Sequence, residues 1–173
     1  MRLRGKRILI LVEEGYEDLE FHYPRLRMRE EGAEVVVAGT GKPSYGGKRG
    51  TTARCDADVR ELRAEDHDGL IVPGGWAPDR LRTSAAVLRL VRDMDRLHRP
   101  VAAICHGPQV LVSADVVRGR RVTSYVSVAD DLRNAGAEWT DAPVMVDGNL
   151  ITSRVPEDLP DFCREIITQL SLE

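Results

Sequence analysis

The stretch VAAICHGPQ, residues 101–109, decides the fold of this chain. Four small or apolar residues run directly into Cys105, His106, Gly107 and Pro108, which suits neither a simple buried strand nor the middle of a helix. A strand that turns sharply into a helix accommodates such a sequence, and the turn pushes its apical side chain into a crevice. We therefore predict a nucleophile elbow with Cys105 at its apex, in a sparsely allowed backbone conformation.

The rest of the chain alternates between short β-branched runs and segments with helical periodicity. The runs predict strands at residues 7–12, 33–39, 69–75 and 100–105. Helical spacing recurs in residues 16–32, through Leu19, Tyr23 and Leu26, and in residues 83–100, through Val87, Leu90, Val91 and Met94. This βαβ alternation indicates an α/β fold. We expect a flavodoxin-like three-layer sandwich with a mostly parallel sheet, in a single domain spanning residues 1–173.

The C-terminal third and one internal segment complete this prediction. Helices are expected in residues 107–116, in residues 127–139 and in residues 156–170, the last with Asp158 as its cap. Residues 142–154 read as a hairpin that turns at Asp147-Gly148-Asn149. Residues 39–52 form a surface loop or a small hairpin. Their glycines fit no phosphate-binding motif, so the sequence does not favour nucleotide binding.

Composition excludes several classes of function. The chain has 173 residues, of which 42% are hydrophobic, and 25 Lys and Arg are interspersed with 28 Asp and Glu for a net charge of -3. No single-sign field is present to attract nucleic acid or anionic lipid. The apolar run at residues 8–12 is followed by two glutamates, so it predicts a strand and no export signal. No apolar stretch approaches the roughly 20 residues that span a bilayer.

The three cysteines, at positions 55, 105 and 163, are widely spaced and match no zinc-binding pattern. We therefore expect a reduced cytoplasmic protein without a metal or a cofactor. A free cysteine after an apolar strand is often a small core residue, and that reading holds for Cys55 and Cys163. For Cys105 the adjoining His-Gly-Pro has no packing rationale, which favours a nucleophile.

The topology predicts where the chemistry lies, because ligands of open α/β sheets bind at the carboxyl ends of the strands. Three segments should converge there, with carboxylates from residues 13–20, a glycine pair from residues 73–79, and the thiol and imidazole of residues 105–108. A helix N-terminus beside Cys105 would lower the pKa of its thiol. The backbone N–H groups of His106 and Gly75 could form an oxyanion hole.

Four motifs in this chain resemble those of the ThiJ/PfpI superfamily. They are EEGYEDLEFHYP at residues 13–24, IVPGGWAPDRLR at 71–82, AICHGPQVLVSADVVRGRRVTSY at 103–125 and ITSRVPEDLP at 151–160. The similarity lies with the PfpI-type intracellular protease branch, which also includes relatives of Parkinson disease protein 7, and implies a class I glutamine amidotransferase-like fold. It implies roles for Cys105 as nucleophile, for its neighbour His106, and for Glu20 as the hydrogen-bond partner of the thiol. It places Gly74, Gly75, His106 and Tyr125 around the oxyanion and substrate.

One position departs from the pattern of this branch. The branch typically carries a glutamate that reaches the histidine of a neighbouring subunit, and the corresponding residue is Asp79. An aspartate keeps the charge but is one methylene shorter, so it would orient His106 less closely. Trp76 is also larger than the residue often found at its position, and would narrow the site or pack at a subunit contact. The resemblance therefore implies a homo-oligomer, from a dimer to a hexamer.

Three functions from different classes are compatible with these residues. The first is a stress-response enzyme, similar to glyoxalase III and deglycases, that converts 2-oxoaldehydes to hydroxy acids through a Cys105 thiolate. The second is an intracellular cysteine peptidase that uses Cys105, His106 and Asp79 across a subunit interface. The third is a non-catalytic sensor or chaperone of oxidative stress, with Cys105 as the oxidised residue. A small carbonyl compound or a peptide is the expected substrate, and the carbonyl chemistry is favoured.

Overall fold

The computed structural model describes residues 1–172, and its central sheet has the order β10-β11-β7-β6-β1-β2-β5. All neighbouring strands are parallel except the hairpin pair β10 and β11. The bounds are β1 (Arg7–Leu11), β2 (Glu34–Gly39), β5 (Ala57–Asp58), β6 (Gly69–Val72), β7 (Val101–Ile104), β10 (Val144–Asp147) and β11 (Leu150–Ser153). The four predicted strands thus occupy the centre of the sheet. Their arrangement with β11 is the flavodoxin-like strand order, which confirms the predicted fold class.

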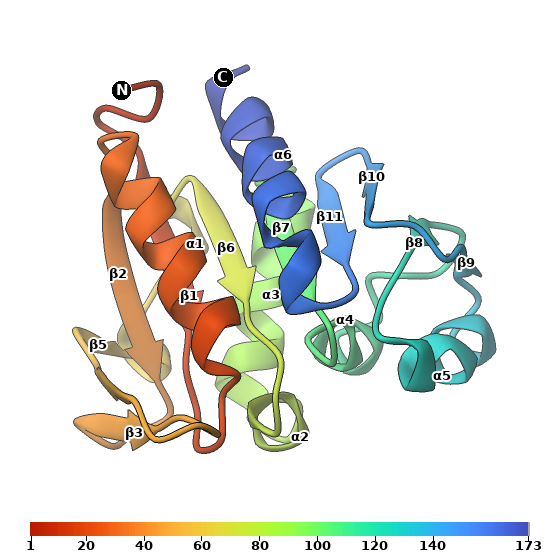
Figure 1. Cartoon of the computed structure of the whole chain (residues 1–173), viewed down its shortest axis with the longest axis horizontal. Coiled ribbons are helices and arrows are strands. Elements are labelled where there is room, and N and C mark those ends of the chain that lie inside the picture. Colours follow the sequence, from red (N-terminus) through yellow and green to blue (C-terminus); the bar gives the residue numbers. More distant parts are fainter. Residues whose placement is uncertain (173) are drawn as a thin grey trace.

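Helices cover both faces of the sheet (Figure 1). Figure 1 shows α1 (Asp18–Glu30) and α6 (Leu159–Ser171) on one face and α3 (Ala85–Arg96) on the other. The shorter helices are α2 (Ala77–Leu81), α4 (Pro108–Ser113) and α5 (Ala129–Asn134), and single 3-10 turns lie at Val59–Glu61, Ala64–Asp66, Val126–Val128 and Pro156–Asp158. Among residues 1–172, no helix combines the length and apolarity needed to cross a membrane.

Two small pairs of strands lie outside the central sheet. The glycine-rich segment predicted as a loop or a small hairpin is a hairpin, in which β3 (Ser44–Gly46) pairs with β4 (Thr52–Arg54). Tyr16 bridges to Gly47 of this hairpin and to Gly75, and so ties the hairpin to the segments that follow β1 and β6. The second pair joins β8 (Arg121–Val122) to β9 (Glu138–Trp139) in parallel.

The helix α3 forms as its sequence predicts. Ser84 precedes it, and the Ser84 hydroxyl accepts a hydrogen bond from the Val87 backbone N–H, which otherwise lacks a partner at a helix start. The predicted apolar face is fully buried against the sheet. At α6 the outcome differs. Asp158 occupies the N-cap position, but its carboxylate binds the Arg154 guanidinium at 2.9 Å and 3.1 Å and caps no helical N–H.

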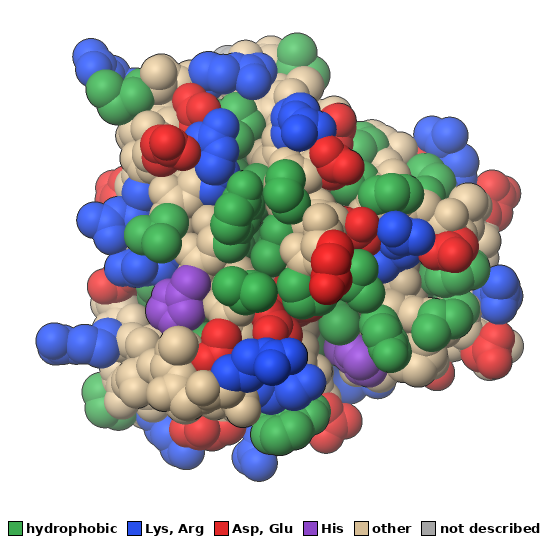
Figure 2. All heavy atoms as spheres, viewed as in Figure 1, with side chains coloured by type: hydrophobic (Ala, Val, Ile, Leu, Met, Phe, Trp, Pro, Cys, Tyr) green, Lys and Arg blue, Asp and Glu red, His purple; other side chains and the backbone are tan. Residues whose placement is uncertain are grey.

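The helix α1 is present, but the residues whose spacing predicted it are not its buried face. Leu19, Tyr23 and Leu26 are 54%, 38% and 56% exposed. The face against the sheet instead carries Asp18, Glu20, Phe21, Pro24 and Met28. Figure 2 shows hydrophobic side chains gathered over this side of the molecule, around α1 and α6. Two carboxylates of α1 are thus buried while an apolar stripe remains at the surface.

Candidate active site

Cys105 lies directly after β7, at the turn into α4. Its φ of 62° is in the left-handed region, where a residue other than glycine costs about 1–3 kcal/mol. Two segments hold this backbone, because the Cys105 N–H donates to the Ser153 carbonyl and the Cys105 carbonyl accepts from the Tyr125 N–H, each at 3.0 Å. A Cβ at Gly107 would lie 2.5 Å from the Val72 carbonyl oxygen, so the turn requires glycine there. The elbow predicted from the sequence is confirmed.

Glu20 is a fully buried carboxyl next to Cys105. Its Oε2 atom accepts a hydrogen bond of 2.8 Å from the Gly74 backbone N–H. A Cβ at Gly74 would lie 2.5 Å from that oxygen and 2.8 Å from Cys105 Cβ. The side chains of Glu20 and Cys105 therefore meet in the space that a side chain at Gly74 would fill. Burial raises the pKa of Glu20 to about 8, and the charge of Glu17 adds to the rise. Glu20 therefore holds a proton at neutral pH.

The backbone N–H groups of His106 and Gly75, which are expected to form the oxyanion hole, lie near enough to the Cys105 sulfur to lower its pKa. The expected lowering of the thiol pKa is wrong. Burial raises the pKa of Cys105 to about 12, and Glu20 raises it further than the two N–H groups lower it. The helix contributes little because α4 has six residues and begins only at Pro108. Cys105 and Glu20 thus compete for negative charge, and the two groups titrate as a coupled pair.

His106 lies on the other side of the sulfur. Its Nδ1 atom is 3.3 Å from Cys105 Sγ, and its Nε2 atom is 3.3 Å from Ser127 Oγ. The ring stacks on Tyr125 with centroids 5.2 Å apart. Burial lowers the pKa of His106, and the charge of Lys48 lowers it further. The site therefore combines a neutral imidazole, which can accept a proton, with a protonated carboxyl, which can donate one.

A cavity of about 650 Å³ opens onto the sulfur. Its walls include the predicted site residues Glu20, Gly75, Asp79, Cys105, His106 and Tyr125, and Gly74 lies beside Glu20. Trp76 forms part of the rim and is 64% exposed. Within residues 1–172 no hydrogen bond joins Asp79 to His106. The fold therefore brings the sequence-predicted residues to one cavity, with Asp79 on its wall and not bonded to the imidazole of the same chain.

The family model for the DJ-1/PfpI family matches residues 6–169. The chain belongs to the DJ-1/PfpI family. A protein of Archaeoglobus fulgidus without an assigned function is 51% identical over 93% of this chain and 96% of its own length. A protein of Pyrococcus abyssi that is named a deglycase is 46% identical over 95% of this chain and 99% of its own length.

A solved DJ-1/PfpI structure shows the same fold in a larger protein. The two-domain protein of Anabaena variabilis, which combines DJ-1/ThiJ/PfpI-like and ferritin-like domains, is similar with a TM-score of 0.93 and 40% identity. The match covers 96% of this chain and 48% of that chain. The present chain thus spans about half the length of that protein.

Sequence reasoning missed several residues of this DJ-1/PfpI site. The hairpin of β3 and β4 brings Lys48 and Arg49 to the cavity, and the chain after β11 brings Val155 and Pro156. Glu17 also lines the cavity, where its carboxylate caps α1 by accepting from the Glu20 N–H at 2.9 Å. The glycines around Lys48 and Arg49 indicated a turn in the sequence, but they did not indicate that this turn would reach the Cys105 cavity.

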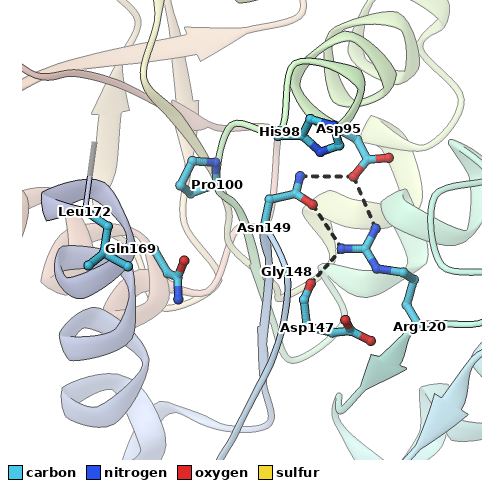
Figure 3. A pocket seen from close by; sticks show the side chains of 9 residues that line it. All are labelled: Asp95, His98, Pro100, Arg120, Asp147, Gly148, Asn149, Gln169 and Leu172. Carbon is cyan, nitrogen blue, oxygen red and sulfur yellow. Dashed lines mark hydrogen bonds and ion pairs between the residues drawn. The ribbon is translucent and has the colours of Figure 1, made fainter.

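A second cavity, of about 570 Å³, lies at the opposite end of the sheet, beside Pro100 and the β10–β11 turn (Figure 3). Figure 3 shows the Arg120 guanidinium at its wall, bonded to Asp95, Asn149 and the Asp147 carbonyl. Neither a thiol nor a hydroxyl is among its lining side chains. Of these two cavities, the one at Cys105 is therefore the one that presents a nucleophilic side chain.

Proposed function

We propose that this DJ-1/PfpI protein is a deglycase-type enzyme that acts on small carbonyl compounds, with the Cys105 sulfur as its nucleophile. The observation that carries the proposal is the pairing of Cys105 with Glu20, a buried carboxyl that is protonated at neutral pH. A carbonyl group needs a proton at its oxygen when sulfur adds to its carbon, and Glu20 can supply one. The deglycase name of the Pyrococcus abyssi relative supports the same assignment.

The reaction begins when sulfur bonds to the aldehyde carbon of a 2-oxoaldehyde. The thiol proton reaches the aldehyde oxygen through Glu20 or His106, which gives a hemithioacetal. For an aldehyde already combined with an amine or a thiol, the Cys105 sulfur replaces that group, which leaves with the proton. The backbone N–H groups of Gly75 and His106 surround the sulfur and can stabilise negative charge on the oxygen.

The second stage moves hydrogen between the two carbons. A base removes the proton on the carbon that carries sulfur, and a proton is returned to the neighbouring carbon, so that the ketone becomes an alcohol and the aldehyde carbon becomes a thioester. Water then hydrolyses the thioester, which releases a 2-hydroxy acid and restores the thiol. One carbon is oxidised as the other is reduced, and the net addition is one water. Glu20 or the neutral imidazole of His106 can relay this proton between the two carbons.

Peptide hydrolysis is the second candidate, and the contact of 3.3 Å between His106 Nδ1 and Cys105 Sγ favours it. The imidazole would take the thiol proton and return it to the departing amine. In this reaction Glu20 has no required step. The two candidates therefore differ in which neighbour of Cys105 is indispensable.

We also propose that the protein is a homo-oligomer in which a second copy approaches the cavity. Asp79 and Trp76 are exposed at its wall and rim, and Leu19, Tyr23 and Leu26 form an exposed apolar stripe on α1. Apolar surface of this kind is commonly covered by a partner. Sedimentation of the pure protein at micromolar concentration should give a dimer or a larger closed assembly, and a strict monomer would contradict the proposal.

The deciding experiment compares wild-type protein with Cys105→Ser on methylglyoxal and on a fluorescent peptide. We expect the wild type to convert methylglyoxal to lactate, and the variant to lose this activity while remaining folded by circular dichroism. Peptide cleavage without methylglyoxal turnover would support the peptidase. No activity on either substrate, together with rapid oxidation of Cys105 by peroxide, would support a sensor of oxidative stress.

A further inference from the structure

Lys48 lies at the mouth of the Cys105 cavity with its charge unneutralised. Its ammonium is 5.3 Å from the centroid of a Trp76 ring, and its charge lowers the pKa values of both Glu20 and His106. The ion pairs of the same hairpin region join Lys42 to Glu14 and Arg49 to Glu17, and within residues 1–172 Lys48 takes part in none. The cation that faces the reacting groups is therefore available to a ligand.

The carboxyl groups of the cavity do not compensate for this charge. Glu17 caps the start of α1 and pairs with Arg49 at 3.4 Å. Glu20 is protonated at neutral pH because it is buried. Asp79 remains, and it adjoins Arg80, a second cavity-lining cation without an ion pair in the described chain. The cavity thus presents a net positive charge to an entering molecule.

Hydrogen bonds fix the backbone of the turn that carries Lys48. The Lys48 N–H donates to the Tyr16 carbonyl at 2.9 Å. The buried carboxylate of Asp18 accepts from the backbone N–H groups of Arg49 and Thr51 at 2.8 Å and 3.0 Å. A Cβ at Gly47 would lie 2.6 Å from Asp18 Oδ1, so the turn packs closely on this carboxylate. Lys48 is therefore held at the cavity by a built turn.

We propose that Lys48 is a specificity-determining residue that binds an anionic group, a carboxylate or a phosphate, on the molecule whose carbonyl reacts at Cys105. The proposal rests on the proposed carbonyl chemistry and names its substrate class as anionic carbonyl compounds. A cavity of about 650 Å³ is much larger than a three-carbon aldehyde requires, so it has room for a longer substrate with a charged end. The Trp76 ring beside Lys48 offers apolar contact to the chain between the two groups.

The first test compares two 2-oxoaldehydes with five carbons each, the anionic 4,5-dioxopentanoate and the neutral 2-oxopentanal. The wild type should favour the anion in kcat/KM, and Lys48→Met should reduce this preference roughly tenfold, the effect of a partly desolvated charge pair. Lys48→Arg, which keeps the charge, should retain most of it. Lys42→Met is the matched control, because Lys42 is an exposed lysine that pairs with Glu14 and does not line the cavity.

The second test needs no turnover. Iodoacetate and iodoacetamide alkylate the same sulfur with loss of iodide, and they differ chiefly in charge. The ratio of their rates at Cys105, read by mass spectrometry, cancels any change in the thiol itself. Lys48→Met should lower the ratio of iodoacetate to iodoacetamide several-fold, and salt should lower the ratio of the wild type. Lys42→Met should leave the ratio unchanged.

The two tests separate the failure of this inference from the failure of the proposed function. If the protein converts no 2-oxoaldehyde but Lys48→Met still lowers the alkylation ratio, the carbonyl chemistry is wrong and the anion site at Lys48 stands. If the protein converts 2-oxoaldehydes, but Lys48→Met changes neither the preference for the anionic 2-oxoaldehyde nor the ratio of alkylation rates, the anion site is overturned. The anion site is also overturned if Lys42→Met lowers the substrate preference and the alkylation ratio as much as Lys48→Met does, since the effect would then come from net charge alone.

Discussion

The carboxyl of Glu20 accepts a hydrogen bond of 2.8 Å from the backbone N–H of Gly74, although 54 residues separate the two along the chain. This bond fixes one Glu20 oxygen at the glycine whose bare Cα also lets Cys105 approach. The Oε1 atom has no hydrogen-bond partner among the described residues, yet Cys105 and Glu20 shift each other's pKa. Gly74 thus holds Glu20 and Cys105 close together, and each of the two groups influences the protonation of the other.

Stability should fall with rising pH because of Glu20. Its pKa is about 8 in the folded protein and near 4.5 when exposed, so between these values the unfolded chain loses a proton that the folded chain keeps. This difference favours unfolding by roughly 3–6 kcal/mol once pH 8 is reached. Glu20→Gln, which cannot ionise, should remove that part of the pH dependence. Urea unfolding at pH 5 and pH 8 measures how the free energy of unfolding changes with pH. The same change in the wild type and in Glu20→Gln would contradict the raised pKa of Glu20.

Gly74→Ala should disable the site by steric conflict alone. Its Cβ would lie 2.5 Å from Glu20 Oε2 and 2.8 Å from Cys105 Cβ, so at least one reacting group must move. We expect kcat/KM to fall by about 10² or more, because small displacements of catalytic groups have effects of this size. Gly119→Ala is the control, since it strains the backbone at a φ of 70° but its Cβ meets no atom within 4 Å and it does not line the cavity. Equal activity losses in the two variants would show that general destabilisation is responsible.

Glu20→Gln and His106→Ala should distinguish the two candidate reactions. In carbonyl addition Glu20 supplies the proton, so Glu20→Gln should abolish turnover of 2-oxoaldehydes while Cys105 still reacts with alkylating agents. His106→Ala would then cost less. In peptide hydrolysis the imidazole must protonate the departing amine, and its loss should cost about 10²–10⁴ in rate. Steady-state rates of both variants on both substrates give the answer, and full activity of both would refute the catalytic roles.

The three cysteines should differ in reactivity. Cys163 is buried in α6, and burial raises its pKa to about 12. Burial and the charge of Asp56 raise the pKa of Cys55 to about 11. Cys105 has a raised pKa too, but it faces an open cavity and adjoins an imidazole and two N–H donors. Competitive labelling with iodoacetamide should modify Cys105 first, and equal rates for the three thiols would mean that its neighbours do not activate it.

Asp18→Asn should loosen the turn that carries Lys48. The Asp18 carboxylate accepts from two backbone N–H groups and from the Thr51 hydroxyl, and an amide can satisfy these donors only in part. A cost of about 1–3 kcal/mol is expected for the disturbed bonds. Hydrogen exchange in residues 47–51 should accelerate, while exchange in β7 stays slow. Unchanged protection of residues 47–51 would show that Asp18 does not hold the turn.

The sequence by itself determined the elements that depend on local chemistry. The β-branched runs gave the central strands, the spacing of Val87, Leu90, Val91 and Met94 gave the buried face of α3, and the passage from Ile104 to Pro108 gave the elbow. These features follow from neighbouring residues, because periodicity and backbone restriction act over a few positions. The motifs around Glu20, Gly75 and Cys105 also indicated that the three would meet, since parallel strands end at one edge.

Only the tertiary structure decided the inward face of α1, the ionisation of the site and the residues that surround it. Leu19, Tyr23 and Leu26 predicted a helix but face outward, because packing between the sheet and α6 turned Glu20 and Phe21 inward. The thiol pKa rose where a helix start predicted a fall, since desolvation and a buried carboxyl outweigh two N–H groups. Lys48 reaches the cavity through hydrogen bonds that span more than thirty residues, from Asp18 to Arg49 and Thr51. Burial and charge depend on neighbours that are distant in the chain, and their effects appear only when the chain is folded.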